Sequence, residues 1–168
     1  ILINPPLDSV LRDGHVDPVT SYLFYNSAPL GLLYIAAVLE RRGETVACID
    51  AAAEKLDIPG TVRRIQEFKP DIIGIGSTTV VFDGTIELAQ KCKEAMPDIP
   101  VVLGGYHVTL LPDEAMQHDC FDIGVIHEGE HTMEEIVDHY KGLRSRESIE
   151  GVVYKLDDGT VHHTPHRK

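Results

Sequence analysis

The stretch Val101-Val102-Leu103-Gly104-Gly105-Tyr106-His107-Val108-Thr109 carries the clearest strand signal in this chain. Its first three residues are apolar and mostly β-branched, which is typical of a buried strand. Two glycines then end the strand without side chains, as happens where the backbone must approach another group closely. In an open α/β sheet, ligands lie at the carboxyl ends of the strands. The stretch therefore predicts a strand that ends beside space for a ligand.

Four other short apolar runs occur in the chain, and an amphipathic segment follows each of the five runs. Such alternation is typical of the α/β class, in which helices cover a parallel sheet. We expect the helix that opens at Pro29 to be mostly core, a second to begin near Pro59, a third to end before Pro97 and a last one to begin near Thr132. The predicted strands are residues 1–4, 45–50, 71–76, 100–104 and 121–126.

Beyond the last helix the pattern changes to that of a β-hairpin. Residues 151–156 and 160–164 alternate like strands, and Asp157-Asp158-Gly159 between them is a turn sequence. We therefore divide the chain into a main domain, residues 1–143, and a hairpin connector, residues 144–168.

Composition limits the classes of function. A length of 168 residues suits about one domain. The formal charge of −12 would repel a phosphate backbone, so we expect no nucleic-acid partner. No apolar run approaches the length of a membrane span, and the start, which lacks Met and signal-peptide features, is typical of a trimmed sequence. We expect a cytoplasmic protein.

The three cysteines are far apart in the sequence. Disulfide frameworks and metal sites need closely spaced pairs, so Cys48, Cys92 and Cys120 are expected to be buried free thiols. The chain has no Cys-x-x-Cys and no three-cysteine cluster that could ligate an iron–sulfur group.

Three patterns have a metal-binding or nucleotide-binding alternative. His127-Glu128-Gly129-Glu130-His131 matches the zinc-peptidase pattern, but it begins at the end of a predicted strand and contains glycine, which favours a strand-to-helix turn. Gly74-x-Gly76-x-x-Thr79 only half resembles a dinucleotide fingerprint. The terminal His162, His163 and His166 are more typical of a solvated strand. We predict no metal ligand and no catalytic residue.

Small and polar residues follow four of the predicted strands. Each group alone is ordinary turn chemistry, whereas four groups on one edge favour a ligand site. The groups are Asn4-Pro5-Pro6, Ser77-Thr78-Thr79, Gly104-Gly105-Tyr106-His107 and Glu128-Gly129-Glu130.

Together with Pro29-Leu30-Gly31-Leu32 and the spacing Gly104-Gly105-x-His107-x-Thr109, these groups resemble the N-terminal cobalamin-binding domain of cobalamin-dependent radical S-adenosylmethionine enzymes. The resemblance covers nearly the whole chain. It implies a flavodoxin-like, Rossmann-like, doubly wound five-stranded parallel sheet of order 2-1-3-4-5, with a C-terminal β-hairpin. The corrin ring would lie on the carboxyl edge, and the nucleotide tail would pass beside the third and fourth strands.

The resemblance also implies the cofactor-binding residues. Ser77, Thr78 and Thr79 would hydrogen-bond the tail, and Gly104 and Gly105 would leave room for it. His107 and Glu128 would lie near the rim of the ring. On this basis Gly105→Leu should leave the fold intact and abolish cobalamin retention. The expected cofactor-binding residues are Asn4, Pro5, Pro6, Ser77, Thr78, Thr79, Gly104, Gly105, Tyr106, His107, Thr109, Glu128, Gly129 and Glu130.

Two positions depart from the pattern that such domains show. Asp13-Gly14-His15 is followed by Pro18 where the cobalt-ligating motif has glycine, so we expect His15 not to bind cobalt. His127 stands where the family usually has glycine before Glu-Gly-Glu, which puts close backbone contact there in doubt.

The implied function is that of a cobalamin-binding module in a larger radical enzyme, inactive by itself. The parent would also use a [4Fe-4S] cluster and S-adenosylmethionine, for methyl transfer or for oxidative cyclisation as in the anaerobic magnesium-protoporphyrin monomethyl ester cyclases. Its partners would be cobalamin and the radical domain of the same polypeptide. The alternative is a flavodoxin-like domain that binds FMN or docks a partner. A receiver domain is disfavoured because Asn4 and Ser77 stand where it needs acids.

Overall fold

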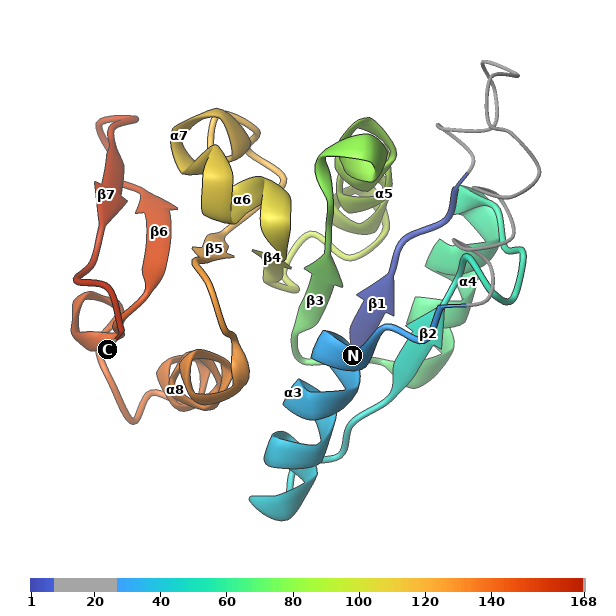
Figure 1. Cartoon of the computed structure of the whole chain (residues 1–168), viewed down its shortest axis with the longest axis horizontal. Helices are drawn as coiled ribbons and strands as arrows, with labels where there is room; N and C mark the ends of the chain where they lie inside the picture. The colour runs from blue at the N-terminus through green and yellow to red at the C-terminus, as the bar shows by residue number, and fades with distance from the viewer. Residues whose placement is uncertain (8–26, 168) are drawn as a thin grey trace.

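A computed structural model describes residues 1–7 and 27–167. Its centre is a seven-stranded sheet of order β2-β1-β3-β4-β5-β6-β7 (Figure 1). His15 lies outside the described residues, and the expectation about cobalt ligation lies outside them too. The strands are β1 Leu2–Asn4, β2 Cys48–Asp50, β3 Ile73–Gly76, β4 Val101–Gly104, β5 Ile123–Val125, β6 Val152–Lys155 and β7 Val161–His163.

The five central strands are parallel, as predicted. β1 pairs with β2 and β3, and β3, β4 and β5 follow in order, which confirms the order 2-1-3-4-5. The strands are shorter than the apolar runs because the ends of each run lie in the connections. The helices are α3 Leu30–Arg41, α4 Ile58–Phe68, α5 Phe82–Ala95, α6 Tyr106–Leu110, α7 Pro112–Ala115 and α8 Glu130–Tyr140, with 3-10 turns η1 Thr79–Val81 and η2 Arg146–Ser148.

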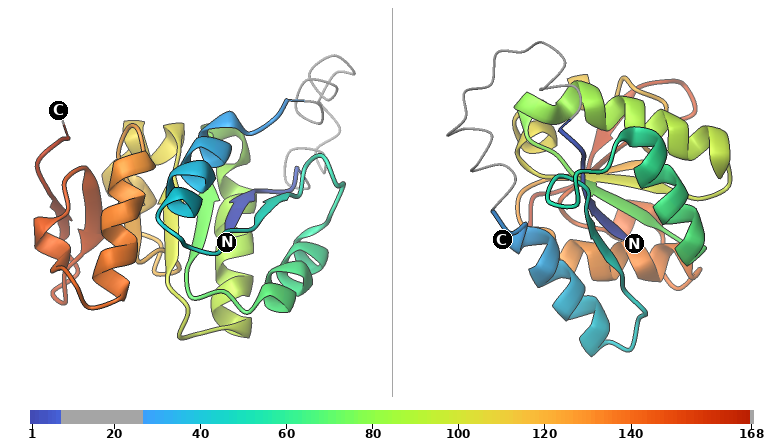
Figure 2. Two further views of the ribbon diagram at one scale, coloured as in Figure 1. Left: turned by 90° about the horizontal axis from the view of Figure 1, so that it is seen from below. Right: turned by 90° about the vertical axis from the view of Figure 1, so that its right-hand side faces the viewer.

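Alternation along the strands gives the sheet two apolar faces. Ile75 and Leu103 belong to the core that packs with α4 and α5. Their neighbour Val102 belongs to the core that packs with α3 and α8. Figure 1 shows α5, α6 and α7 on one side of the sheet and α3 and α8 on the other, and the right view of Figure 2 shows the same three layers from the β2 edge.

The C-terminal hairpin is present and extends the sheet. β6 pairs with β5 in antiparallel fashion, and the side chain of Tyr154 is fully buried. His163 Nε2 lies 2.7 Å from Asp113 Oδ1, and Lys155 Nζ lies 2.5 Å from Asp119 Oδ1. Strand β6 starts at the carboxyl edge of β5, and β7 returns to that edge. Arg167 therefore lies beside the first turn of α8.

Helix α3 is less buried than its sequence predicts. Only Ala36 and Leu39 are buried, whereas Leu33 and Tyr34 are 43% and 61% exposed. The expectation that this helix is mostly core is therefore wrong. Its apolar residues near the N-terminus face a cavity instead, as described below.

The three thiols are free, but they differ in burial. Cys92 and Cys120 are buried as expected, and burial raises the pKa of Cys92 to about 12 and that of Cys120 to about 11. Cys48 is exposed, contrary to expectation, because it begins the edge strand β2. Within residues 1–7 and 27–167, no helix has the length and apolarity needed to cross a membrane.

The packing at Gly124 in β5 gives a test of the fold. A Cβ there would lie 2.7 Å from methyl groups of Val108 and Val153. Gly124→Ala should therefore lower the free energy of unfolding by about 1–3 kcal/mol in urea denaturation. Gly31→Ala, in helix α3 with nothing within 4 Å of its Cβ, should raise it by up to about 1 kcal/mol. Equal stability of the two variants would contradict this packing.

Candidate functional site

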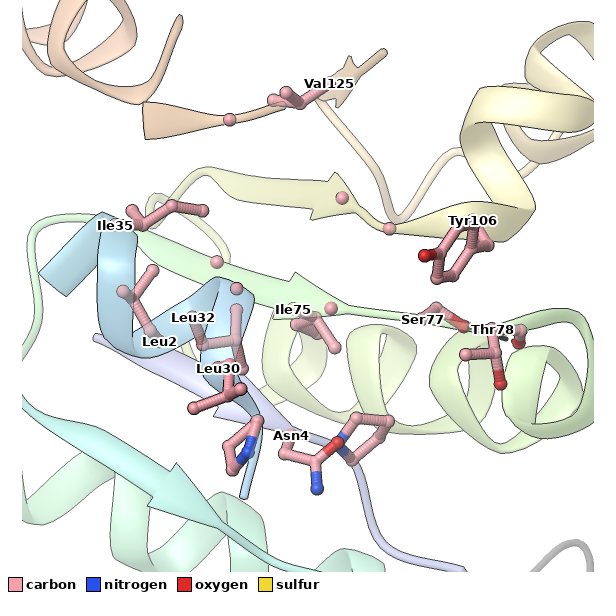
Figure 3. A pocket seen from close by; sticks show the side chains of 18 of the residues that line it. Leu2, Asn4, Leu30, Leu32, Ile35, Ile75, Ser77, Thr78, Tyr106 and Val125 are labelled. Carbon is pink, nitrogen blue, oxygen red and sulfur yellow. Dashed lines mark hydrogen bonds between the residues drawn. The ribbon is translucent and has the colours of Figure 1, made fainter. Parts of the chain in front are cut away.

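A cavity of about 760 Å³ opens between α3, the start of α8 and the sheet, at the carboxyl ends of β1, β3 and β4. Its volume lies within the range of small-molecule and cofactor sites. Figure 3 shows residues of α3 facing the strands, with Ser77, Thr78 and Tyr106 at the ends of β3 and β4. The predicted ligand edge therefore coincides with a real concavity.

The floor of the cavity is a strip of sheet that has almost no side chains. Gly74 and Gly76 in β3 and Gly104 in β4 lie on the cavity face, and Gly76 and Gly104 are cross-strand partners. A Cβ on Gly104 would meet nothing within 4 Å, so this residue faces open space. Leu32 lies over Gly76 and Leu2 lies beside Gly74, so the bare backbone at Gly104 is the part of the floor on which a ring can lie.

The walls are apolar and come from two helices, α3 and α8. Leu30 and Leu32 of α3 and Met133 of α8 line the space. The helices are tied near their C-terminal ends, where Arg42 Nη2 lies 2.6 Å from Asp138 Oδ1. The left view of Figure 2 shows α3 and α8 side by side. The cavity is thus closed at the amino edge of the sheet and open at the carboxyl edge.

The rim is polar and, among the described residues, carries acidic side chains. Asn4 Nδ2 donates a hydrogen bond to Asp50 Oδ1 at 2.8 Å, which fixes the orientation of its amide. Tyr106 is 74% exposed after β4, and Glu128 and Glu130 line the cavity after the neighbouring strand β5. Among the residues that the structure describes, no lysine or arginine lines the cavity.

All but three of the predicted cofactor-binding residues line this cavity. Pro6 is buried beside it, and Thr79 and His107 lie behind the loops that form it. The lining residues among those predicted are Asn4, Pro5, Ser77, Thr78, Gly104, Gly105, Tyr106, Thr109, Glu128, Gly129 and Glu130.

Ser77 lines the cavity, but the protein itself uses its hydroxyl. The residue is buried, and its Oγ lies 3.0 Å from Thr85 Oγ1 and 3.1 Å from the Thr78 carbonyl oxygen. These contacts join the end of β3 to α5. The neighbouring Thr78 is exposed at the cavity, so its hydroxyl is more available to a ligand than that of Ser77.

Gly104 and Gly105 have different roles, although the sequence gives them one. Gly105 has φ +98°, and a Cβ there would collide with the carbonyl oxygen of Ser77 and lie 2.9 Å from its nitrogen. The Ser77 N–H donates to the Gly104 carbonyl at 2.8 Å. Gly105 thus lets two loops touch, so the expectation that Gly105→Leu leaves the fold intact is wrong.

His107 belongs to α6, and its side chain is buried. The ring stacks on the Phe82 ring, with 3.5 Å between centroids. Its Nδ1 lies 3.3 Å from Thr79 Oγ1, while its Nε2 is buried and has no hydrogen-bond partner among the described atoms. Burial lowers the pKa of His107, against the opposing effects of Glu114 and Asp83. The ring is therefore neutral near pH 7.

The turn between β5 and α8 brings His127 to the rim in a left-handed conformation, φ +65°. Glycine adopts this conformation readily, which agrees with the glycine usual in the resembled family. The His127 N–H donates to Thr109 Oγ1 at 3.0 Å, and Thr109 Oγ1 donates to the Gly105 carbonyl at 3.0 Å. Thr109 thereby links the loops that follow β4 and β5.

The zinc-peptidase alternative fails on geometry. Helix α8 begins at Glu130, so His127 lies in the preceding turn and shares no helix face with His131. The terminal histidines also separate: the nearest partners of His162, His163 and His166 are the Tyr154 ring, Asp113 and the His127 ring. In the described part of the chain, no three His, Cys, Asp or Glu side chains form a metal-binding group.

Sequence reasoning missed the apolar part of the site. On a helix, apolar residues at core-like spacing look the same whether they pack on protein or line a cavity. The one useful signal was Pro29-Leu30-Gly31-Leu32, which came only from the resemblance. The missed lining residues include Leu2, Leu30, Leu32, Ile35, Gly74, Ile75, Gly76, Val102, Val125 and Met133.

Known proteins resemble this chain in sequence. Residues 17–137 match the family model described as a B12 binding domain. The chain is 34% identical over 170 residues to an uncharacterized methyltransferase of Pyrococcus horikoshii, covering 99% of this chain and 34% of the relative. It is 32% identical over 145 residues to the anaerobic magnesium-protoporphyrin IX monomethyl ester cyclase of Rubrivivax gelatinosus, covering 83% and 26%. It thus spans about a third or less of these relatives.

Two solved structures share the fold. One is the cobalamin-dependent S-adenosylmethionine radical enzyme OxsB with aqua-cobalamin and S-adenosylmethionine bound, with TM-score 0.82 and 16% identity, covering 99% of this chain and 22% of that one. The other is the radical S-adenosylmethionine methyltransferase TsrM of Kitasatospora setae, with TM-score 0.78 and 20% identity, covering 98% and 29%. The seven-stranded arrangement, including the hairpin, therefore recurs in known proteins.

The different roles of the two glycines can be measured. Gly105→Ala should lower the free energy of unfolding by about 1–3 kcal/mol, because φ +98° is strained for alanine and the Cβ meets Ser77. Gly104→Ala, whose Cβ enters open space, should change it by less than about 1 kcal/mol. Urea denaturation of both variants is the test, and a Gly105→Ala protein as stable as Gly104→Ala would refute the assignment.

The lowered pKa of His107 predicts how stability depends on pH. The unfolded chain binds this proton near the ordinary value of 6.5, before the folded chain does, so stability falls as pH falls below that value. Wild type should therefore lose stability relative to His107→Phe, which cannot titrate at this position, when the pH is lowered from about 7.5 to about 5.5. A difference that stays constant, or shifts the other way, would contradict the neutral buried ring.

Proposed function

The chain belongs to the B12-binding domain family, and from this premise we propose that its cavity between α3, α8 and the sheet holds cobalamin for a larger radical S-adenosylmethionine enzyme. The observation that carries the proposal is the glycine strip. Gly74, Gly76 and Gly104 form the floor of the cavity. Because they have no side chains, a ring can approach the backbone at the ends of β3 and β4. An ordinary side chain at Gly104 would occupy that space.

The walls fit a ligand with one large apolar part. Leu30, Leu32 and Met133 offer apolar surface to a group inserted between the helices and the sheet. Burial of such a group is worth roughly 25 cal/mol per Å² of apolar surface removed from water. We assign the nucleotide base of cobalamin to this inner space and the corrin ring to the open carboxyl edge above it.

Charge separates cobalamin from the flavin alternative. FMN carries a phosphate dianion, which needs basic side chains or a bundle of free backbone N–H groups. The described lining offers no lysine or arginine, and Glu128 and Glu130 would repel a dianion. Cobalamin carries its phosphate as a phosphodiester with a single negative charge, and its corrin side chains end in neutral amides, for which carboxylate, amide and hydroxyl groups are suitable partners.

The proposed contacts follow from position. At the carboxyl edge, Asn4, Thr78, Tyr106 and Glu128 would meet the corrin rim, and Gly104 would meet the inserted tail. Pro6, Thr79 and His107, which do not line the cavity, would act only through the loops. When bound, cobalamin supplies a cobalt centre for group or electron transfer, and the part of this chain is to bind and orient it.

The parent reaction is proposed from the relatives. A methyltransferase and a cyclase are among them, so we propose methyl transfer or oxidative cyclisation, with the [4Fe-4S] cluster and S-adenosylmethionine held by another domain of the same polypeptide. Residues 144–168 would connect to that domain, and residues 1–143 would form the cofactor domain. A cytoplasmic location agrees with the three free thiols.

Cofactor retention tests the proposal. The 168-residue chain, mixed with hydroxocobalamin and desalted, should keep corrin absorbance, whereas Gly104→Leu should lose it because the side chain fills the floor of the cavity. Ala95→Leu, at an exposed helix end away from the cavity, is the control for added bulk and should retain the cofactor. Circular dichroism should show all three proteins folded.

Two results would reject the cavity as the cobalamin site. One is a wild-type chain that passes the column colourless but retains FMN. The other is a Gly104→Leu protein that retains as much corrin as wild type.

A further inference from the structure

The short helix α6 stands between the loops that form the cavity. It begins directly after Gly105, and its N-terminal residue Tyr106 lines the cavity. Thr109 ties it to the turn after β5 through the His127 N–H. On its other side, His107 ties it to the turn η1 after β3. The loops after β3, β4 and β5 thus meet at one short element.

The bond between His107 and Thr79 lies outside the cavity. Thr79 is exposed and lines no part of the cavity, and its hydroxyl lies 3.3 Å from His107 Nδ1. Residues on either side of it along the chain differ, since Thr78 and Val81 line the cavity. A bond made behind the loop therefore fixes residues that face the ligand space.

His107 is a poor choice for stability alone. Its ring is 2% exposed and stacks on Phe82, so an apolar ring would satisfy the same packing. The imidazole instead leaves Nε2 buried without a partner among the described atoms, which costs free energy. A histidine retained at this cost is explained if its other nitrogen, Nδ1, has a function.

We propose that His107 and Thr79 are positioning residues, whose hydrogen bond sets the loop after β3 against α6 in the geometry that accepts cobalamin. The proposal rests on the proposed function, and it assigns a role to two residues that do not touch the cofactor. Thr78, Val81 and Tyr106 are the lining residues whose places the bond fixes. Without it, the two loops keep their backbone contacts at Ser77 but lose the outer tie.

The test compares affinity with stability in single and double variants. Thr79→Val keeps the shape of an exposed side chain and removes the hydroxyl, and His107→Phe keeps the ring on Phe82 and removes both nitrogens. Each should weaken hydroxocobalamin binding by roughly threefold to tenfold, the size of one hydrogen bond. Thr79→Ser should bind as wild type does, and Thr45→Val, an exposed change far from the cavity, is the control.

The double variant and the unfolding midpoint separate positioning from general stability. Because both changes break one bond, Thr79→Val with His107→Phe should bind no more weakly than the weaker single variant. The urea midpoint of cofactor-free His107→Phe should equal or exceed that of wild type, since the unpaired Nε2 is gone.

Affinity equal to wild type in both single variants would overturn the proposal. Multiplied losses in the double variant, or affinity losses that follow the loss of stability, would overturn it too. A wild-type chain that binds no cobalamin would reject the proposed function instead, so the two failures are distinguishable.

Discussion

Contact between Gly105 and the backbone of Ser77 is the constraint on which the site depends. It brings the loop after β4 against the end of β3 so closely that no side chain fits between them. Backbone bonds from Ser77 N–H to Gly104 and from His107 N–H to Ser77 then join the two loops. The ends of the two central strands consequently behave as one surface, and the cavity is built on it.

The rest of the site follows from what lies on either side of this surface. On the cavity side, Gly104 leaves part of the floor bare, and the ion pair between Arg42 and Asp138 ties α3 to α8 near the amino edge. On the other side, α6 connects the loops through His107 and Thr109. The fold thus keeps an open apolar space in a region where most α/β proteins pack a helix fully against the sheet.

Much of this was readable from sequence. Short apolar runs alternating with amphipathic segments predicted the parallel sheet, and the Asp-Gly turn predicted the hairpin, because both signals are local. The sequence did not show how individual residues lie relative to neighbouring elements. The sequence could not distinguish Gly104 from Gly105, since their difference is a backbone angle and a neighbour across the sheet. It also could not show that α3 faces a cavity, or that Cys48 begins an edge strand.

A crystal structure of the 168-residue chain with bound cobalamin is the most direct measurement of the central claim. The account predicts electron density for the nucleotide base between α3 and the strip formed by Gly76 and Gly104, with the corrin ring above the ends of β3 and β4. Density for the cofactor elsewhere, with α3 still separated from the sheet by an empty cavity, would contradict it.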